Sequence, residues 1–503
     1  MKRYLTTVLA GLMVVGMTLP SYAAEIKATG QVRQRYRNWT NLDLDSDAPS
    51  GLGGDRHYFD NRTRFGVDAK LSDGVRARIE LERYFDWGTQ APNAFQDTSP
   101  RVRQAWMDFA IPGTEQSTPW RIQAGRSFFS VGHQFVWGNS LTGEDGITVY
   151  GPLGPGNLKF RIGQQRISTK GVPAAPGATR RFGSAGAVHM AIDYKVEVAP
   201  KQNVEFYVIY GNDKNVGDFS TMVQNATGTL VTSAEEYWIG GAYSGAIGPV
   251  AIRAEVTGQF GDARSNACLT AAGGPALTPG TCVTPGQDID RSAFFIFADG
   301  TYKPVPEASI GLGISFATGD DNQNDADFDN FVAPLASFTS SPTRVWTDSG
   351  FFFGNRSGRG IGSAATNRRY NFWGRGTEDI DSAASVDNTG GLFSPGLLEV
   401  KVKGKYVVIN PKLTLFGNLA FLWAAEDEGV PGAGGDKYLG TEIDGKVSYR
   451  PYQNISITGY VGYFIPGDFF EQQGALRAAT IAAGGNPVED DAWIFRAEAV
   501  VTF

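Results

Sequence analysis

Asp491-Ala-Trp-Ile-Phe-Arg-Ala-Glu-Ala-Val-Val-Thr-Phe503 is the stretch that decides the fold. Alternate residues of a β-strand point to opposite faces. One face of this strand therefore carries Trp493, Phe495, Ala497, Ala499, Val501 and Phe503, and the other carries Arg496, Glu498 and Thr502. An apolar row backed by a charged row is typical of a membrane wall between lipid and water.

The same period-two alternation recurs along the chain and predicts about eighteen strands, each long enough to cross a membrane as part of a tilted barrel. We expect an all-β fold, an antiparallel up-and-down transmembrane β-barrel. The predicted strands lie near 25–39, 55–71, 74–87, 101–111, 119–127, 145–151, 157–167, 186–198, 202–212, 233–246, 249–261, 288–303, 307–318, 395–409, 411–425, 436–450, 453–465 and 490–503.

The connections alternate between tight turns and long loops. Ser72-Asp73-Gly74 and Asn410-Pro411 are tight turns, whereas 40–54, 128–144 and 319–394 are long loops. Short periplasmic turns and long extracellular loops are typical of outer-membrane barrels. The segment 319–394 is too long for an ordinary connection and is expected to fold inward or outward as a loop that narrows the pore.

Residues 1–23 have the features of a secretory signal peptide, namely Lys2 and Arg3, an apolar run from Leu9 to Leu19, and Ser21-Tyr22-Ala23 before the cleavage site. The predicted barrel domain then covers 24–503, and the predicted location is the outer membrane of a Gram-negative-type bacterium. The net charge of −7 argues against nucleic acid as a partner. Outer-membrane lipid and lipopolysaccharide are the expected surroundings.

Aromatic residues near the predicted strand ends suggest two interfacial girdles. These residues are Trp39, Tyr84, Trp87, Trp120, Tyr150, Tyr194, Tyr210, Trp238, Tyr302, Tyr449, Tyr463 and Trp493.

Alternation also predicts which charged residues face the lumen, and basic residues outnumber acidic ones there. Guanidinium groups bind carboxylate and phosphate, so the pattern favours anionic solutes. A balanced lumen, in which carboxylates on neighbouring strands pair with these cations, is the other interpretation. The predicted pore-lining residues are Lys27, Arg33, Arg35, Arg37, Arg62, Arg64, Arg76, Arg78, Arg121, Arg126, Lys159, Arg161, Arg253, Arg450 and Arg496, with Lys401, Lys403, Lys405 and Lys446 on the same face.

Three further features concern cross-links, metals and catalysis. Cys268 and Cys282 are expected to form a disulfide in an exported chain. Asp320, Asp325 and Asp327 form a weak calcium candidate that lacks the central Gly and closing Glu of an EF-hand. The three histidines, His57, His133 and His189, belong to no recognisable catalytic motif, and no haem attachment motif is present, so neither an enzyme nor a cofactor is predicted.

Three stretches resemble the alginate export family of outer-membrane porins. They are Ala124-Gly-Arg-Ser-Phe-Phe-Ser-Val-Gly-His-Gln-Phe-Val-Trp-Gly-Asn139, then Phe316-Ala-Thr-Gly-Asp-Asp-Asn322 with Phe331 to Pro334, and Leu439 to Asp444 continuing to Gly459-Tyr-Val-Gly-Tyr-Phe-Ile-Pro-Gly-Asp468. The resemblance implies a monomeric eighteen-strand barrel with an arginine-rich constriction that passes an acidic, uronic-acid polysaccharide outward. Arg126 is the one arginine of this chain within a matching motif.

The sequence therefore predicts an outer-membrane channel for diffusion of anionic solutes. The family resemblance adds an acidic polysaccharide as a candidate solute. Two alternatives stay open, a general small-solute porin and a barrel that sheathes a periplasmic or electron-transfer partner.

Overall fold

The computed structural model describes residues 25–40, 56–86, 100–114, 117–137, 144–165, 187–213, 224–225, 228–229, 231–265, 288–319, 327–329, 331, 396–426, 436–468 and 491–503. The predicted signal peptide, both cysteines, Asp320 and Asp325 lie outside these residues. Within them, no helix is long and apolar enough to span a membrane.

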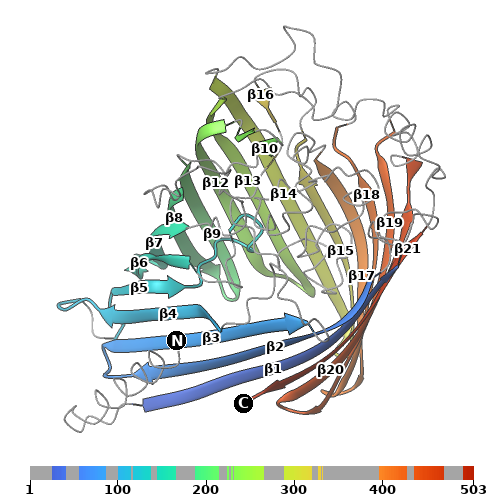
Figure 1. Ribbon diagram of the computed structural model, residues 1–503, viewed down its shortest axis with the longest axis horizontal. Coiled ribbons are helices and arrows are strands. Elements are labelled where there is room, and N and C mark those ends of the chain that lie inside the picture. The colour runs from blue at the N-terminus through green and yellow to red at the C-terminus, as the bar shows by residue number, and fades with distance from the viewer. Residues whose placement is uncertain are drawn as a thin grey trace, which may run out of the picture.

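Antiparallel strands form one closed cylinder (Figure 1). Its sheet contains nineteen strands. The two-residue β16 (Asp327–Phe328) pairs parallel with β14 beyond the end of β15, so the wall itself has eighteen strands. This confirms the predicted fold and strand number. A further two-residue pair, β10 (Gln224–Asn225) and β11 (Gly228–Thr229), lies outside the wall.

The first half of the wall runs from the amino-terminal strand to the ninth. Its members are β1 (Glu25–Thr40), β2 (Arg56–Lys70), β3 (Val75–Asp86), β4 (Arg101–Ala110), β5 (Arg121–Ser127), β6 (Glu144–Leu153), β7 (Gly156–Gln165), β8 (Ala187–Ala199) and β9 (Gln202–Asp213). The second half consists of β12 (Val231–Ile247), β13 (Val250–Ser265), β14 (Asp288–Val305), β15 (Ala308–Ala317), β17 (Leu397–Ile409), β18 (Leu413–Trp423), β19 (Tyr438–Tyr452), β20 (Ile455–Pro466) and β21 (Ala492–Thr502).

Closure occurs between the first and last strands of the wall. β1 pairs with β21 from Gln31–Thr502 to Thr40–Trp493. Beyond this ladder, the backbone N–H of Gly30 donates to the carbonyl of Phe503 at 2.7 Å, and the N–H of Phe503 donates to the carbonyl of Gly30 at 3.0 Å. A closed cylinder leaves no unpaired strand edge in the membrane.

Alternation separates an apolar outside from a polar inside. On β21, Trp493, Phe495 and Val501 are exposed on the outside, whereas Arg496 is buried on the lumen side. On β13, Val256 is exposed and its neighbours Glu255 and Thr257 are buried. The exposed apolar row is the band that lipid covers in a membrane barrel.

Among the expected girdle aromatics whose side chains the structure describes, two face inward instead. Trp238 is fully buried in a lumen cluster, and the Tyr150 hydroxyl donates to Asp108 on the inner wall. Their position near a strand end predicted contact with the membrane interface. Strand register, however, determines which face of the wall a side chain occupies, and both residues occupy inward-facing positions.

Candidate functional site: the barrel lumen

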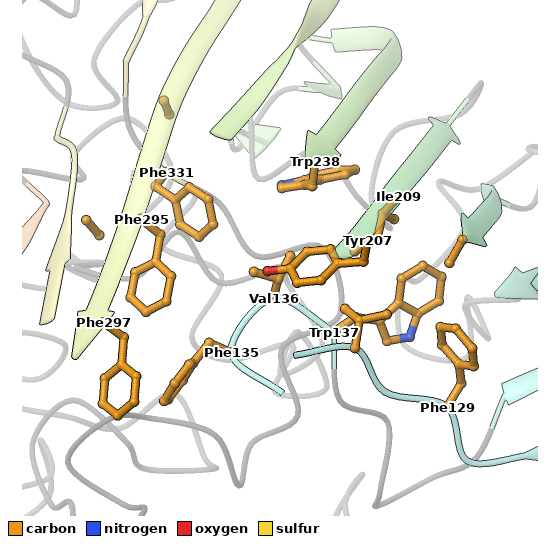
Figure 2. Packing of buried hydrophobic residues seen from close by; sticks show 14 residues of the cluster. Phe129, Phe135, Val136, Trp137, Tyr207, Ile209, Trp238, Phe295, Phe297 and Phe331 are labelled. Atoms are coloured by element: carbon orange, nitrogen blue, oxygen red, sulfur yellow. The ribbon is translucent and has the colours of Figure 1, made fainter. Parts of the chain in front are cut away.

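A segment that follows β5 folds back into the lumen. Its residues 128–137 include several large apolar side chains, which pack against inward-facing residues of β9, β12 and β14 (Figure 2). Phe135 lies 4.5 Å from Phe297 and 5.4 Å from Phe295 between ring centroids. The cluster comprises Phe129, Val131, Phe135, Val136, Trp137, Ala191, Tyr207, Ile209, Trp238, Ala293, Phe295, Phe297, Ala317 and Phe331.

Two wall carboxylates hold the backbone of this inward segment. The N–H of Gly132 donates to Glu205 on β9 at 2.5 Å, and the N–H of His133 donates to Glu255 on β13 at 2.6 Å. Tyr207 donates its hydroxyl to the other oxygen of Glu255 at 2.7 Å. The segment is therefore fixed by hydrogen bonds to wall carboxyl groups as well as by apolar packing.

Phe331 of the long loop 319–394 also lies inside. The N–H of Phe331 donates to the carbonyl of Thr318 at 3.0 Å, and its ring stacks on Phe295 at 5.5 Å. The inward segment and Phe331 thus meet on the inner face of β14. Within 319–394, the structure describes residues 319, 327–329 and 331.

Several acidic side chains of the wall beside the inward segment are buried, namely Asp193, Glu236 and Glu255. Asp193 pairs with Lys159 at 2.7 Å, and Glu236 pairs with Arg291 at 2.7 Å. The charges of Asp193 and Glu236 are therefore balanced by neighbouring cations.

Arginines dominate the wall formed by β21, β1 and β2. Asp60 contacts three of them, Arg33 at 3.4 Å, Arg35 at 2.8 Å and Arg37 at 3.0 Å. Three guanidinium groups thus gather around one carboxylate, and Glu498 also approaches Arg33 at 3.8 Å.

The neighbouring strands β2, β3 and β4 continue the basic surface. Arg64 pairs with Glu82 at 2.6 Å, and Arg62 donates to the uncharged amide of Gln31 at 2.8 Å. Arg101 and Arg103, which sequence reasoning did not single out, also contact Glu82. The alternation in Arg101-Val102-Arg103 could have predicted that both arginines face the lumen. The bulge between β3 and β4, which brings both to one carboxylate, could not be predicted from the sequence.

The basic wall lies across the lumen from the inward segment. In an eighteen-strand ring, β21 is nine strands from β9 in both directions, and β1 is nine strands from β12. The glutamate on β9 and the apolar anchors on β9 and β12 are therefore opposite the arginines of β21 and β1. The apolar cluster of the lumen thus lies opposite the arginines of β21 and β1.

The other predicted pore residues occupy varied positions on the inner face. Arg78 pairs with Asp68 at 2.5 Å, Arg121 contacts Asp108, and Arg161 is buried against Glu144, Ser127 and Thr148. Arg253 lies 3.6 Å from Asp299, and Arg496 stacks on Tyr460. Lys27, Arg76 and Arg450 are exposed near the strand ends that carry the tight turns.

Arg126 is an error among the predicted pore residues, because it points outward. It stands in register with Ala105 and Asp145, on the face opposite to Arg121 and Ser127. Its side chain is 38% exposed and forms a 2.6 Å ion pair with Asp145. The motif resemblance supplied the residue, whereas strand alternation fixes its direction.

Asp327 of the calcium candidate and His133 are the remaining residues to be placed in the structure. Asp327 lies in β16, but its side chain is not described, and no group of three metal-ligating side chains occurs within the described ranges. His133 contacts the carbonyl of Tyr243 through Nε2 at 3.0 Å, while Ser127 accepts from Arg161. Burial lowers the pKa of His133, which lies in the inward segment.

Comparison with solved structures shows the same barrel fold in other proteins. The chain resembles Acinetobacter baumannii OccAB1 with a TM-score of 0.51 and 10% identity, over 95% of this chain and 97% of that one. Pseudomonas aeruginosa OccK11 (OpdR) matches with a TM-score of 0.49 and 11% identity, over 95% and 96%. No family model and no curated protein matches the chain.

The lipid-facing exterior, the closed wall and this structural likeness define the class. The protein is an eighteen-strand β-barrel of the outer-membrane type, located in the outer membrane of a Gram-negative-type bacterium. The fold does not single out the alginate export family.

Proposed function

We propose that the protein is an outer-membrane diffusion channel for anionic solutes. The observation that carries the proposal is the contact of three arginines with one carboxylate, Asp60, on the wall opposite the inward segment. Two buried carboxylates beside the inward segment, Asp193 and Glu236, are paired with Lys159 and Arg291. Together these features support a positive potential along the remaining path.

The lumen arginines are suited to weak, reversible binding of a passing anion rather than to tight binding. Conduction requires several weak sites, so that a solute is attracted but leaves again. Arginines already shared with Asp60, Glu82 and Gln31 meet that requirement, because an entering anion competes with existing partners. A uronic-acid polysaccharide is the finer candidate that the family resemblance supports, and it carries the same carboxylate groups.

Ion selectivity in planar bilayers tests the proposal. Under a salt gradient, the reversal potential of the wild-type channel is expected to show anion preference, and cation preference would overturn the proposal. Ion conductance by the isolated protein also separates a channel from a sheath that needs a protein partner in its lumen.

A matched pair of variants tests whether lumen charges set the ion selectivity. Arg62→Gln removes a lumen charge whose side chain donates to the amide of Gln31, and it should lower the anion preference. Arg126→Gln removes the same charge from the outer face, and it should leave the reversal potential unchanged. Equal shifts in both variants would mean that overall charge, rather than the lumen, sets selectivity.

A further inference from the structure

The outer face of β1 and β2 carries polar side chains about halfway along the strands. Gln34 is the tenth of the sixteen residues of β1, and Thr63 is the eighth of the fifteen residues of β2. Both face outward, because their sequence neighbours Arg33 and Arg62 make their contacts in the lumen. In a membrane barrel, the outer face at this depth is normally an apolar band.

A third polar side chain, Asn61, joins these two. Asn61 stands opposite Gln34 in the ladder between β1 and β2, and the hydroxyl of Thr63 donates to its Oδ1 at 3.1 Å. The amide oxygen of Gln34 has no hydrogen-bond partner among the described residues. Because the terminal amide of glutamine rotates easily, either its oxygen or its NH2 group can turn toward a neighbour. Lipid tails supply no such partner.

The middle of the wall is apolar on the strands that face other directions. Outward side chains near the middle of eight of these strands are exposed and aliphatic. They are Val208 of β9, Ile239 of β12, Val256 of β13, Ile296 of β14, Leu312 of β15, Val402 of β17, Ile443 of β19 and Val461 of β20. Lipid suits these positions, whereas hydrogen-bonding groups at the same depth suit contact with protein.

The wall beside the polar residues is low. Ala499 of β21 stands opposite Gln34, and Ala497 stands opposite Tyr36. On the next strand, Gly459 stands opposite Ala497, and a Cβ at Gly459 would meet nothing within 4 Å. Small side chains allow a neighbouring wall to approach closely, which brings polar groups within hydrogen-bonding distance. β21, β1 and β2 are adjacent strands, so these features form one surface (Figure 1).

We propose that this surface, formed by Gln34, Asn61 and Thr63 with Ala497 and Ala499, is the contact between two copies of the barrel in the membrane. Amide and hydroxyl groups both donate and accept hydrogen bonds, so the surface can pair with itself. One self-complementary surface produces a two-fold dimer. A two-fold axis parallel to the pore brings the same residues of both copies to the same depth.

The dimer differs from what the family resemblance implies, which is a monomeric barrel. It also stands apart from the proposed anion channel, because it concerns the outer face and requires nothing of the lumen. Failure of one proposal therefore leaves the other intact.

Thiol cross-linking in isolated outer membranes tests the contact. Gln34→Cys and Thr63→Cys, each in a chain with Cys268→Ala and Cys282→Ala, should give a covalent dimer with a membrane-permeable bifunctional maleimide. Val256→Cys is the matched control, because Val256 lies near the middle of a strand on the far wall. Equal dimer yields in all three variants, or cross-links to a different protein, would overturn the pairing of two copies.

A second measurement follows the dimer in lipid vesicles by energy transfer between labelled copies. Gln34→Leu with Thr63→Val keeps the approximate size of both side chains but removes their hydrogen bonding, and it should raise the dissociation constant roughly tenfold. Ala499→Trp should separate the copies by its bulk, whereas Leu312→Trp, on the lipid face elsewhere, should dimerise as wild type. Heat-dependent migration on SDS gels confirms that each barrel is folded. A monomeric wild type, or dissociation constants that none of these variants changes, would overturn the proposal.

Discussion

Gly132 is the residue that lets the inward segment approach the wall. Its backbone has φ of +54°, and a Cβ at this position would lie 2.7 Å from the carboxylate of Glu255. The left-handed conformation and the close carboxylate both favour glycine. The hydrogen bonds from Gly132 and His133 depend on that approach.

Gly132→Ala should therefore loosen the inward segment. The left-handed backbone alone costs about 1–2 kcal/mol for alanine, and displacement of Glu255 adds to this. We expect a lower urea midpoint of unfolding and a larger single-channel conductance. Gly113→Ala is the matched control, because Gly113 also has a positive φ, +82°, but a Cβ there meets nothing within 4 Å; equal conductance changes in the two variants would contradict this account.

His133 should make the same segment sensitive to acid. Burial lowers its pKa from the usual 6.5, so below about pH 6.5 the unfolded chain binds more protons at this residue than the folded one. Stability then falls as pH falls through the interval between the two pKa values. In His133→Gln, the urea midpoint of unfolding should depend less on pH over this interval than it does in the wild type. A pH profile identical to that of the wild type would show that His133 does not contribute.

The segment 128–137 illustrates what strand periodicity leaves out. Alternation predicted the wall because each strand repeats the same two-faced pattern, and Trp493, Phe495 and Arg496 lie on the expected faces. The segment itself has no such period and was interpreted as an ordinary outer loop. Its density of Phe, Val and Trp between residues 128 and 137 was the signal that it is buried, but the partners on β9, β12 and β14 lie far away in sequence.

Trp137 is a large side chain that packs the inward segment against the wall. The side chain is fully buried, 5.4 Å from Phe129 and 4.2 Å from His189 between ring centroids. Trp137→Ala should destabilise the segment by about 3–5 kcal/mol and raise the single-channel conductance. Trp493→Ala, at a residue on the lipid face, should leave conductance near wild type, and the reverse order of effects would place the constriction elsewhere.

The charge of the whole molecule differs from the charge that a solute in the lumen would meet. The net charge of −7 is a sum over all residues, whereas the proposed channel exposes a solute to the arginines around Asp60 and Glu82. Sequence alternation predicted most of these inward cations. It could not predict which carboxylates approach each of them, since those distances depend on side-chain conformations and on the bulge beside Glu80.

Salt concentration should therefore tune selectivity. Exposed charges are screened over about 10 Å at 0.1 M salt and about 3 Å at 1 M. Anion preference, measured at the same concentration ratio, should decline as mean salt rises. A preference independent of salt would indicate contact binding in a narrow passage rather than a field across the lumen.

Pairing of β1 with β21 imposes an order of events on biogenesis. The two partners are separated by most of the polypeptide, so the amino-terminal strand must wait, without its final neighbour, until translation has produced the other. Such non-local pairing is slow to form, and the exposed edge is prone to aggregate in the meantime. Delivery of this chain to its membrane consequently requires the cell to keep a nearly finished polypeptide from folding prematurely, and to complete the seam only at its destination.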